Sequence, residues 1–411
     1  MFILRLLTVG VLAAQPWAMP TTADRGLSTS TGPSPTAASS STVEAAAQLE
    51  QLSKIALAAA TKDLAEKQGH AKPGECTVQT LRIRRNWHDF SRRERKNWIN
   101  AQLCLQTRQP RTPSQKAPGV RTRYDDFVAT HINQTMYIHY SGTFLAWHRW
   151  FIFELEEAMR EECGYRGDYP YWDWGADVDG MEKSPVFDGS DTSLSGDGEY
   201  VEQDGDIPLV LPGVEPVKLP TGEGGGCVSG GPFKDYTQNL GPASLIMPGG
   251  NVTALADPLT YNPRCLKRDL TTEILQMFNT YPRIVGTILN HSTIWDFEMG
   301  VQGVPGTGSI GVHGGGHYSM GGDPGRDVYV SPADPAFWLH HGMIDRIYWI
   351  WQSLDLPKRR NAISGTGTFL NHPASANTTL DTVLNLGYAR EHTQRMKDVL
   401  STTAGPFCYV Y

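Results

Sequence analysis

Histidines gather in two clusters, and this arrangement constrains the chain more than any other feature of its sequence. The first cluster consists of His131, His139 and His148. The second contains His313 and His317 and continues to the pair His340-His341. Three imidazoles can hold one metal ion and leave coordination positions open, which is typical of a reactive site and not of a structural one. Two such trios predict a pair of metal ions within one fold.

The donor set narrows the identity of the metal. An all-imidazole set suits copper or zinc, but a single catalytic zinc would need only one trio. Two trios favour two metals about 3.5–4 Å apart that clamp one small molecule between them. Dioxygen is the natural occupant of a paired copper site, and we therefore expect two copper ions with O2 as co-substrate.

Two longer motifs surround these histidines. The first runs from His139 through Glu156 and contains Phe144-Leu145 and Trp147-His148-Arg149; the second is Asp334 to Asp345, with Phe337-Trp338-Leu339-His340-His341 inside it. Both resemble the copper-binding signatures of the tyrosinase, catechol oxidase and haemocyanin family. The resemblance spans roughly residues 76 to 411 and is closest to short secreted fungal polyphenol oxidases, which share the His-Gly-Gly-Gly-His sequence at 313–317. It implies oxidation of o-diphenols to o-quinones while O2 is reduced to water.

Within the second signature, we expect His341 to be the ligand and His340 to lie beside it. The signature places the ligand second in the pair. On a helix, Asp345 lies one turn beyond His341 on the same face, where its carboxylate could accept the free ring N–H. His313 and His317 would also share a helix face, although the three glycines between them are poor helix formers.

The resemblance also suggests which residues surround the substrate. In relatives, monophenol hydroxylation is associated with an Asn or Asp just after the first ligand of the second copper, paired with a nearby Glu. Gly314 stands at that position here, no acid lies between Gly300 and His317, and Gln302 cannot act as a carboxylate base. We therefore expect weak or absent monophenol hydroxylation. Val328 corresponds to the gate residue over the second copper, and we expect Tyr318 and Phe337 near the same pocket.

Helical periodicity places the metals in a bundle. We expect helices at residues 124–136, 147–162, 270–281 and 340–354, with another at 91–105. Because bundle cores often hold metals between facing helices, the predicted fold class is mainly α, with a four-helix core holding the dicopper site, long irregular loops and few short strands. Residues 177–265 are the longest irregular stretch and could rim the pocket.

The N-terminal part suggests secretion. Residues 1–18 resemble a signal peptide, with Arg5 before the apolar run Leu6–Ala14, and that run is too short to span a bilayer. Residues 19–42 form a Ser/Thr/Pro-rich segment predicted to be disordered. Residues 43–75 form a helical segment that is either a pro-segment or docks on the core, and residues 76–411 form the tyrosinase-like catalytic domain.

Six cysteines agree with an extracellular protein. They allow fifteen pairings, of which we expect Cys76–Cys408, Cys104–Cys163 and Cys227–Cys265. Four sequons are candidate N-glycosylation sites, at Asn133, Asn251, Asn290 and Asn377.

Two rival functions stay open: an oxygen carrier of the haemocyanin type, and an o-aminophenol or secondary-metabolite phenol oxidase. The net charge of −7 argues against nucleic-acid binding, so the expected partners are small phenols. The oligomeric state is undecided, with a monomer favoured. Tyr409-Val410-Tyr411 resembles the motif that closes the catalytic domain, and no plug domain or latency of that kind is expected.

Overall fold

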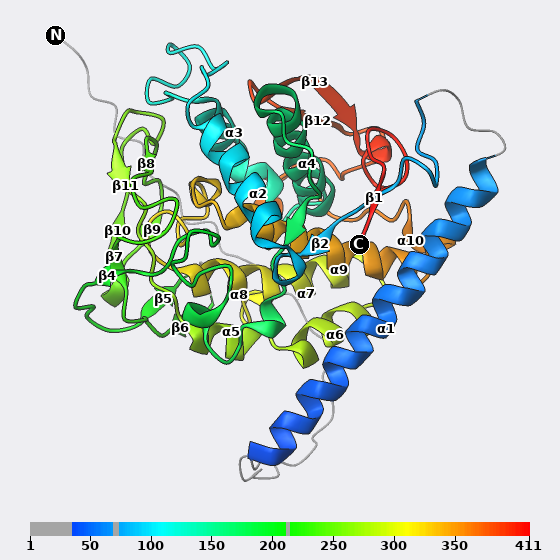
Figure 1. The fold of residues 1–411 in the computed structure, drawn as a ribbon, viewed down its shortest axis with the longest axis horizontal. Coiled ribbons are helices and arrows are strands. Elements are labelled where there is room, and N and C mark those ends of the chain that lie inside the picture. The colour runs from blue at the N-terminus through cyan, green and yellow to red at the C-terminus, as the bar shows by residue number, and fades with distance from the viewer. Residues whose placement is uncertain (1–34, 69–73, 211–213) are drawn as a thin grey trace.

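The computed structural model describes residues 35–68, 74–210 and 214–411 (Figure 1). The predicted signal peptide and most of the Ser/Thr/Pro-rich segment lie outside these residues. The described part is mainly helical, which confirms the predicted fold class. Its helices are α1 (Pro35–Gln68), α2 (Arg92–Leu105), α3 (Arg123–Ile138), α4 (Phe144–Cys163), α5 (Thr272–Phe278), α6 (Tyr281–Leu289), α7 (Ile294–Gln302), α8 (Gly311–Met320), α9 (Phe337–Ser353) and α10 (Leu356–Arg359).

Short strands form two-stranded sheets around the helices. Two of the sheets are parallel, β1 (Arg82–Ile83) with β14 (Tyr409–Val410) and β2 (Arg85–Asn86) with β3 (Pro170–Tyr171). The antiparallel pairs are β4 (Gly198–Tyr200) with β7 (Gly225–Val228), β5 (Ile207–Leu209) with β6 (Val217–Leu219), β8 (Thr237–Gln238) with β11 (Arg264–Cys265), β9 (Leu245–Ile246) with β10 (Val252–Thr253), and β12 (Val383–Leu386) with β13 (Arg390–Arg395). Strands β4 to β11 belong to the long stretch between α4 and α5 and gather on the side of the molecule away from α1 (Figure 1).

Local sequence signals explain where the central helices begin and end. Thr122 and Asp125 form a capping box at the start of α3, in which each side chain satisfies the other's backbone N–H. Helix α4 ends at Gly164, which adopts a left-handed conformation with φ 69°. These signals bracket the segment that carries the first histidine cluster.

The helix predicted at 270–281 is shorter in the structure, and a second helix that was not predicted follows it. Helix α5 ends at Phe278, and α6 starts at Tyr281 with Pro282 in its first turn. Proline suits that position because the first turn of a helix does not use its backbone N–H. Asn279 lies in the break, where its Nδ2 donates to the carbonyl of Val312 on α8 at 2.8 Å. The break therefore ties α5 to the helix that carries the second histidine pair.

Helices α3, α4, α8 and α9 surround the centre of the body. Helix α4 packs against both α3 and α9, and α8 packs against α9. Between α3, α4 and α9, the buried rings of Phe127, Phe151 and Trp338 contact one another. This core resembles the predicted four-helix arrangement and brings the two histidine-bearing regions together.

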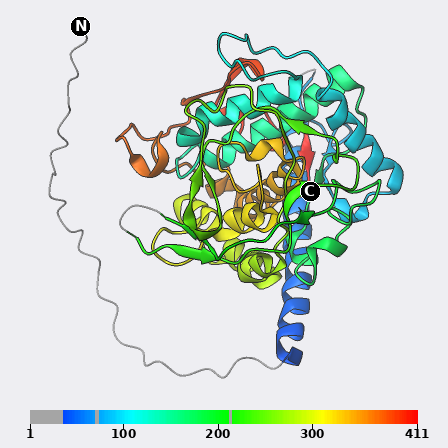
Figure 2. The same ribbon diagram turned by 90° about the vertical axis from the view of Figure 1, so that its left-hand side faces the viewer.

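Helix α1 docks on the outside of this core and packs against α6 and α9. It begins at Pro35, earlier than the Val43 expected from the sequence, and its N-terminal end projects beyond the body (Figures 1 and 2). Buried residues recur along one face, namely Leu49, Leu52, Ala56, Ala60 and Leu64. Arg346 of α9 donates to the Ser53 hydroxyl at 2.7 Å. Residues of α1 therefore dock on the core, as one of the two expectations from the sequence had it.

All three expected disulfides form, Cys76–Cys408, Cys104–Cys163 and Cys227–Cys265. The first joins the segment after α1 to the residue just before the C-terminal strand β14, and the second joins α2 to the end of α4. Within the described ranges, every helix is too short or too polar to pass through a bilayer.

Candidate metal centre and substrate cavity

The first histidine trio comes from two helices and the turn between them. His131 lies on α3, His139 is the residue at which α3 ends, and His148 lies in the second turn of α4. Their Nδ1 atoms lie 2.8 to 3.0 Å from the carbonyls of Tyr329, Thr135 and Phe144, respectively. Because a carbonyl can only accept, each Nδ1 carries the proton and each Nε2 keeps a free lone pair.

These three rings converge. Their potential ligand atoms lie within 4.8 Å of one another, and all three residues are buried. Burial lowers the pKa of each ring, for His139 to about 4, so the rings are neutral at neutral pH. A neutral imidazole is the form that binds a metal. Among the described residues, the Nε2 atoms of His131 and His148 find no hydrogen-bond partner, which is energetically costly for buried polar atoms unless an ion satisfies them.

The second cluster joins α8 to α9. His313 and His317 are four residues apart on α8, and His341 is on α9. The Nε2 atoms of His317 and His341 lie 3.3 Å apart. Two nitrogens that share one ion through bonds of about 2 Å are expected at roughly this separation. Within the part of the chain that the structure describes, Nε2 of His313 also has no hydrogen-bond partner, so the residues present fit a metal with three imidazole ligands.

The glycines between His313 and His317 allow close packing, which explains why a helix forms despite their low propensity. A Cβ on Gly315 would lie 1.9 Å from Oδ1 of Asn279, and one on Gly316 would lie 2.3 Å from two atoms of the His340 ring. Any side chain here would force α8 away from α5 or α9. Tertiary packing therefore outweighs helix propensity at these positions.

His340 joins the second cluster in space, since its ring lies among those of His313, His317 and His341. Its Nδ1, however, lies 3.1 Å from the indole Nε1 of Trp174. An indole N–H can only donate, so Nδ1 of His340 accepts and the neutral ring carries its proton on Nε2. That leaves no free lone pair on His340, whereas the nitrogens of His341 are not committed in this way. The hydrogen bonding favours His341 as the ligand.

The two clusters touch each other. The rings of His148 and His341 stack with centroids 4.5 Å apart. Phe337 lies at the junction: its ring stacks on His341 at 4.1 Å and meets His131 edge-on at 5.6 Å. Phe337 is fully buried and is not among the residues that line the cavity described next. It therefore packs against histidine rings of both clusters and does not face the cavity.

A cavity of about 310 Å³ opens onto both clusters. His139 lines it from the first cluster, and His313 and His317 from the second. On α8, Gly314 and Tyr318 are the positions that are only partly buried, and both line the cavity. The remaining wall is largely apolar and includes Leu209, Val210, Val214, Val217, Ile246, Val304, Pro305, Ile310 and Val328. The long irregular stretch therefore supplies part of the rim, as the sequence suggested.

Gln302 lines the cavity, but its side chain is hydrogen-bonded to Tyr140. Its Oε1 accepts the backbone N–H of Tyr140 at 2.7 Å, and its carbonyl accepts the Tyr140 hydroxyl at 2.7 Å. Tyr140 follows His139 directly and has a positive φ of 45°. Gln302 therefore stabilises the turn that presents His139 to the cavity.

Comparison with known proteins agrees with this geometry. The model of the common central domain of tyrosinase matches residues 121–354, which span both histidine clusters. The chain belongs to the tyrosinase family. That family uses dinuclear copper, and the two clusters of this tyrosinase-family protein are compatible with such a pair.

Relatives cover most of the chain. Tyrosinase P of Aspergillus terreus is 43% identical over 332 residues, which are 80% of this chain and 91% of that protein. An N-acetyl-6-hydroxytryptophan oxidase of Emericella nidulans is 38% identical over 350 residues, 82% of this chain and 94% of that protein. The solved structure of a polyphenol oxidase variant from Thermothelomyces thermophila superposes with a TM-score of 0.83 and 41% identity, covering 88% of this chain and 97% of that one.

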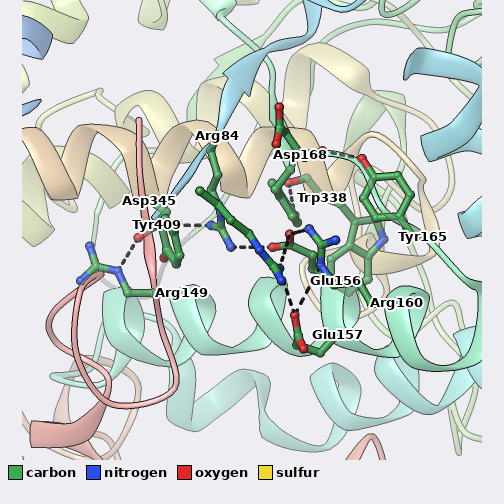
Figure 3. A network of polar contacts seen from close by, with 12 residues as sticks. Arg84, Arg149, Glu156, Glu157, Arg160, Tyr165, Asp168, Trp338, Asp345 and Tyr409 are labelled. Atoms are coloured by element: carbon green, nitrogen blue, oxygen red, sulfur yellow. Dashed lines mark hydrogen bonds and ion pairs between the residues drawn. The ribbon is translucent and has the colours of Figure 1, made fainter. Parts of the chain in front are cut away.

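Asp345 has a different role from the one predicted for this tyrosinase-family protein. Its Oδ1 lies 2.5 Å from Nε of Arg149, and its Oδ2 accepts the hydroxyl of Tyr409 at 2.6 Å (Figure 3). The hydroxyl of Tyr411 donates to the same Oδ2, also at 2.6 Å. Nδ1 of His341 has no hydrogen-bond partner, so the expected hydrogen bond to Asp345 is absent from the described structure. The strong donors around Asp345 outcompete an imidazole N–H because charged pairs make stronger hydrogen bonds.

Sequence reasoning did not identify Tyr329, Tyr140 or Arg326. Tyr329 orients His131 through its backbone carbonyl, which no side-chain pattern reveals. Tyr140 was detectable in principle, because it lies in the helix break next to His139. Arg326 lies two residues before Val328, but a lone arginine in a loop carries no distinctive spacing.

Proposed function

We propose that this protein is a secreted dicopper phenol oxidase that oxidises o-diphenols to o-quinones and hydroxylates monophenols weakly or not at all. The supporting observation is the cavity of about 310 Å³ that opens onto both histidine clusters. Its volume is at the lower end of the range for small-molecule sites, and its mostly apolar lining suits an aromatic ring.

The ligands we propose are His131, His139 and His148 for one copper and His313, His317 and His341 for the other. When bound, the copper pair would take two electrons from each diphenol, and two diphenols together would supply the four electrons and four protons that reduce O2 to water. The protein's contribution is positioning. Backbone carbonyls hold the rings of the first trio in one tautomer, and apolar side chains exclude water from the diphenol.

The cavity wall supports a preference for diphenols. Gly314 has no side chain to hold a water beside His313, and Gln302 is bonded to Tyr140. Among the described residues that line the cavity, Glu215 is the only carboxylate, and it is exposed at the rim. The described lining therefore offers no carboxylate base near His313 to deprotonate a phenol, and monophenols should react slowly.

Oxygen consumption with a matched pair of neutral substrates tests the proposal. Copper-loaded protein should oxidise 4-methylcatechol much faster than 4-methylphenol, and His341→Ala should lose the activity because the second site is incomplete. Faster turnover of 4-methylphenol would contradict the substrate preference. Reversible oxygenation without any catechol turnover would instead favour an oxygen carrier.

Access at Val328 offers a second test. Val328 is 38% exposed at the cavity wall, and Val328→Phe should narrow the entrance. We expect kcat/KM to fall more for 4-tert-butylcatechol than for catechol. An equal loss for both substrates would argue that residue 328 does not control access.

A second candidate is an oxidase of hydroxylated aromatic metabolites such as o-aminophenols. It is favoured by the relative from Emericella nidulans whose name specifies N-acetyl-6-hydroxytryptophan. Turnover of 2-aminophenol or 6-hydroxyindoles at higher kcat/KM than catechols would support it over the first candidate.

Secretion is proposed on the signal-like N-terminus and the three disulfides. The asparagines of all four sequons, Asn133, Asn251, Asn290 and Asn377, are exposed and so accessible to glycans. Expression in a eukaryotic secretory host should yield protein in the medium whose mass falls after glycosidase treatment. Retention of the full-length chain inside the cell would contradict secretion.

A further inference from the structure

Arg326 is a buried cation in the wall of the cavity. It lies in the loop between α8 and α9, is only 4% exposed, and lines the cavity together with Tyr318. The rest of the lining is mainly apolar, and the only other charged side chain among the described lining residues is Glu215 at the exposed rim. A single buried charge in an apolar cavity is well placed to select a ligand of opposite charge.

Hydrogen bonding leaves much of the Arg326 side chain unsatisfied. Its Nε and Nη1 have no partner in the described structure. Its closest carboxylate is Asp269, whose Oδ2 lies 3.6 Å from Nη2, too far for a normal hydrogen bond. A guanidinium presents five donors and stays protonated in proteins, so Asp269 offsets the charge but cannot satisfy the donors.

The acidic side chains near Arg326 form hydrogen bonds with other groups. Asp323 pairs with Arg264 through two contacts of 2.7 and 3.0 Å. Asp327 accepts the backbone N–H groups of Ala243 and Ser244. Oδ1 of Asp269 accepts hydrogen bonds from the Gln203 side chain and the backbone of Gly222. None of these acids can supply Arg326 with the paired acceptor oxygens that its planar group favours.

We propose that Arg326 binds a carboxylate on the substrate, so that the cavity selects phenols that carry a short acidic side chain. This inference rests on the proposed phenol-oxidase function. The ring would lie over the histidine clusters while the carboxylate reaches the loop that holds Arg326. A carboxylate fits better than a phosphate, because only one guanidinium is present and Asp269 already offsets part of its charge. The two oxygens of a carboxylate match the fork of one arginine.

A pair of substrates that differ mainly in charge can test whether Arg326 recognises the carboxylate. We compare 3-(3,4-dihydroxyphenyl)propionate with its methyl ester, using the copper-loaded full chain. The acid should be preferred in kcat/KM by about 10-fold or more, the scale of one buried charge-assisted hydrogen bond. In Arg326→Gln this preference should disappear, mainly through a higher KM for the acid. Arg326→Lys keeps the charge without the fork and should retain part of the preference.

Controls distinguish a binding role from a packing role. Arg92→Gln removes an exposed arginine far along the chain and should leave the acid-to-ester ratio unchanged. An Arg326→Gln variant that lowers kcat/KM equally for acid and ester would show that Arg326 only packs the loop. The wild-type ratio does not depend on any variant folding, and a ratio near one would overturn the proposal.

Calorimetry makes the test independent of turnover. The non-oxidisable 3-phenylpropionate should bind the wild-type protein at least about 10-fold more tightly than 3-phenylpropionamide, and Arg326→Gln should remove the difference. If neither diphenol is oxidised but the acid still binds selectively, the phenol-oxidase function fails and the carboxylate site stands. If catechols are oxidised and the acid binds no better than the amide, only the carboxylate site fails.

Discussion

Nε of Arg149 lies 2.5 Å from Oδ1 of Asp345, and this buried ion pair joins the two helices that carry His148 and His341. Arg149 follows His148 on α4, and Asp345 lies one turn after His341 on α9. Arg84 and Tyr409 also donate hydrogen bonds to Asp345 (Figure 3), and the hydroxyl of Tyr411 does so as well. Burial alone would raise the pKa of Asp345, but Arg149 and Arg84 outweigh it and hold the pKa below its ordinary value.

Removing the charge of Asp345 should therefore be costly. Asp345→Asn leaves Arg149 and Arg84 buried without their shared counter-ion, and we expect the free energy of unfolding to fall by about 3–5 kcal/mol. Urea denaturation of the two proteins measures this. Asp381→Asn is the matched control, because Asp381 pairs with Arg395 and Lys397 but is 68% exposed, and such pairs contribute little. Equal small effects would contradict a structural role for the buried pair.

The choice between His340 and His341 predicts different metal contents. His341→Ala should lose one of the two coppers, because the second trio is incomplete. His340→Gln should keep both coppers while lowering the melting temperature, since it disturbs the hydrogen bond from Trp174. Copper analysis of the purified proteins checks both outcomes. The opposite pattern would reassign the ligand to His340.

Close packing at Gly316 predicts that a single methyl group is harmful there. Gly316→Ala would place its Cβ 2.3 Å from the His340 ring, so α8 and α9 must separate. We expect a lower melting temperature and weaker binding of the second copper. The control is Gly286→Ala on α6, where the Cβ meets only the Asn290 side chain, at 3.3 Å. That substitution should be tolerated, and improved helix propensity could add up to about 1 kcal/mol.

The lowered pKa of Glu94 should make the stability of the fold depend on pH in the acid range. Hydrogen bonds from Ser91, together with Arg85, lower the pKa of Glu94 from 4.5 to about 2. Between these values the unfolded chain binds a proton that the folded chain does not, so the stabilisation is complete above about pH 4.5 and is lost as the pH falls toward 2. Metal-free Glu94→Gln should therefore show a shallower loss of melting temperature between pH 5 and 3 than the metal-free wild type. Parallel slopes would refute this assignment.

Much of the fold was predictable because it depends on local patterns. The histidine-bearing helices α3, α4 and α9 were expected from periodicity. In the structure each begins one to three residues earlier than predicted, α3 and α4 end one or two residues later, and α9 ends one residue earlier. The break at Asn279 was not foreseen, since it depends on a hydrogen bond to Val312 on a distant helix. Helix α8 was uncertain for a related reason: its glycines disfavour a helix, and only the contacts with Asn279 and His340 explain why they are needed.

By itself, the sequence determined the donor atoms and their grouping: two trios of imidazoles at spacings that place them on facing helices, within motifs long enough to indicate the family. Tertiary structure decided what surrounds them. The hydrogen bond from Trp174 fixes the tautomer of His340. Arg149 and the C-terminal tyrosines donate to the Asp345 carboxylate. Arg326 lies in the cavity wall with Nε and Nη1 unpaired among the described residues. The physical reason is that hydrogen bonds and burial depend on partners far apart in the chain, whereas periodicity and motif spacing report only on neighbours.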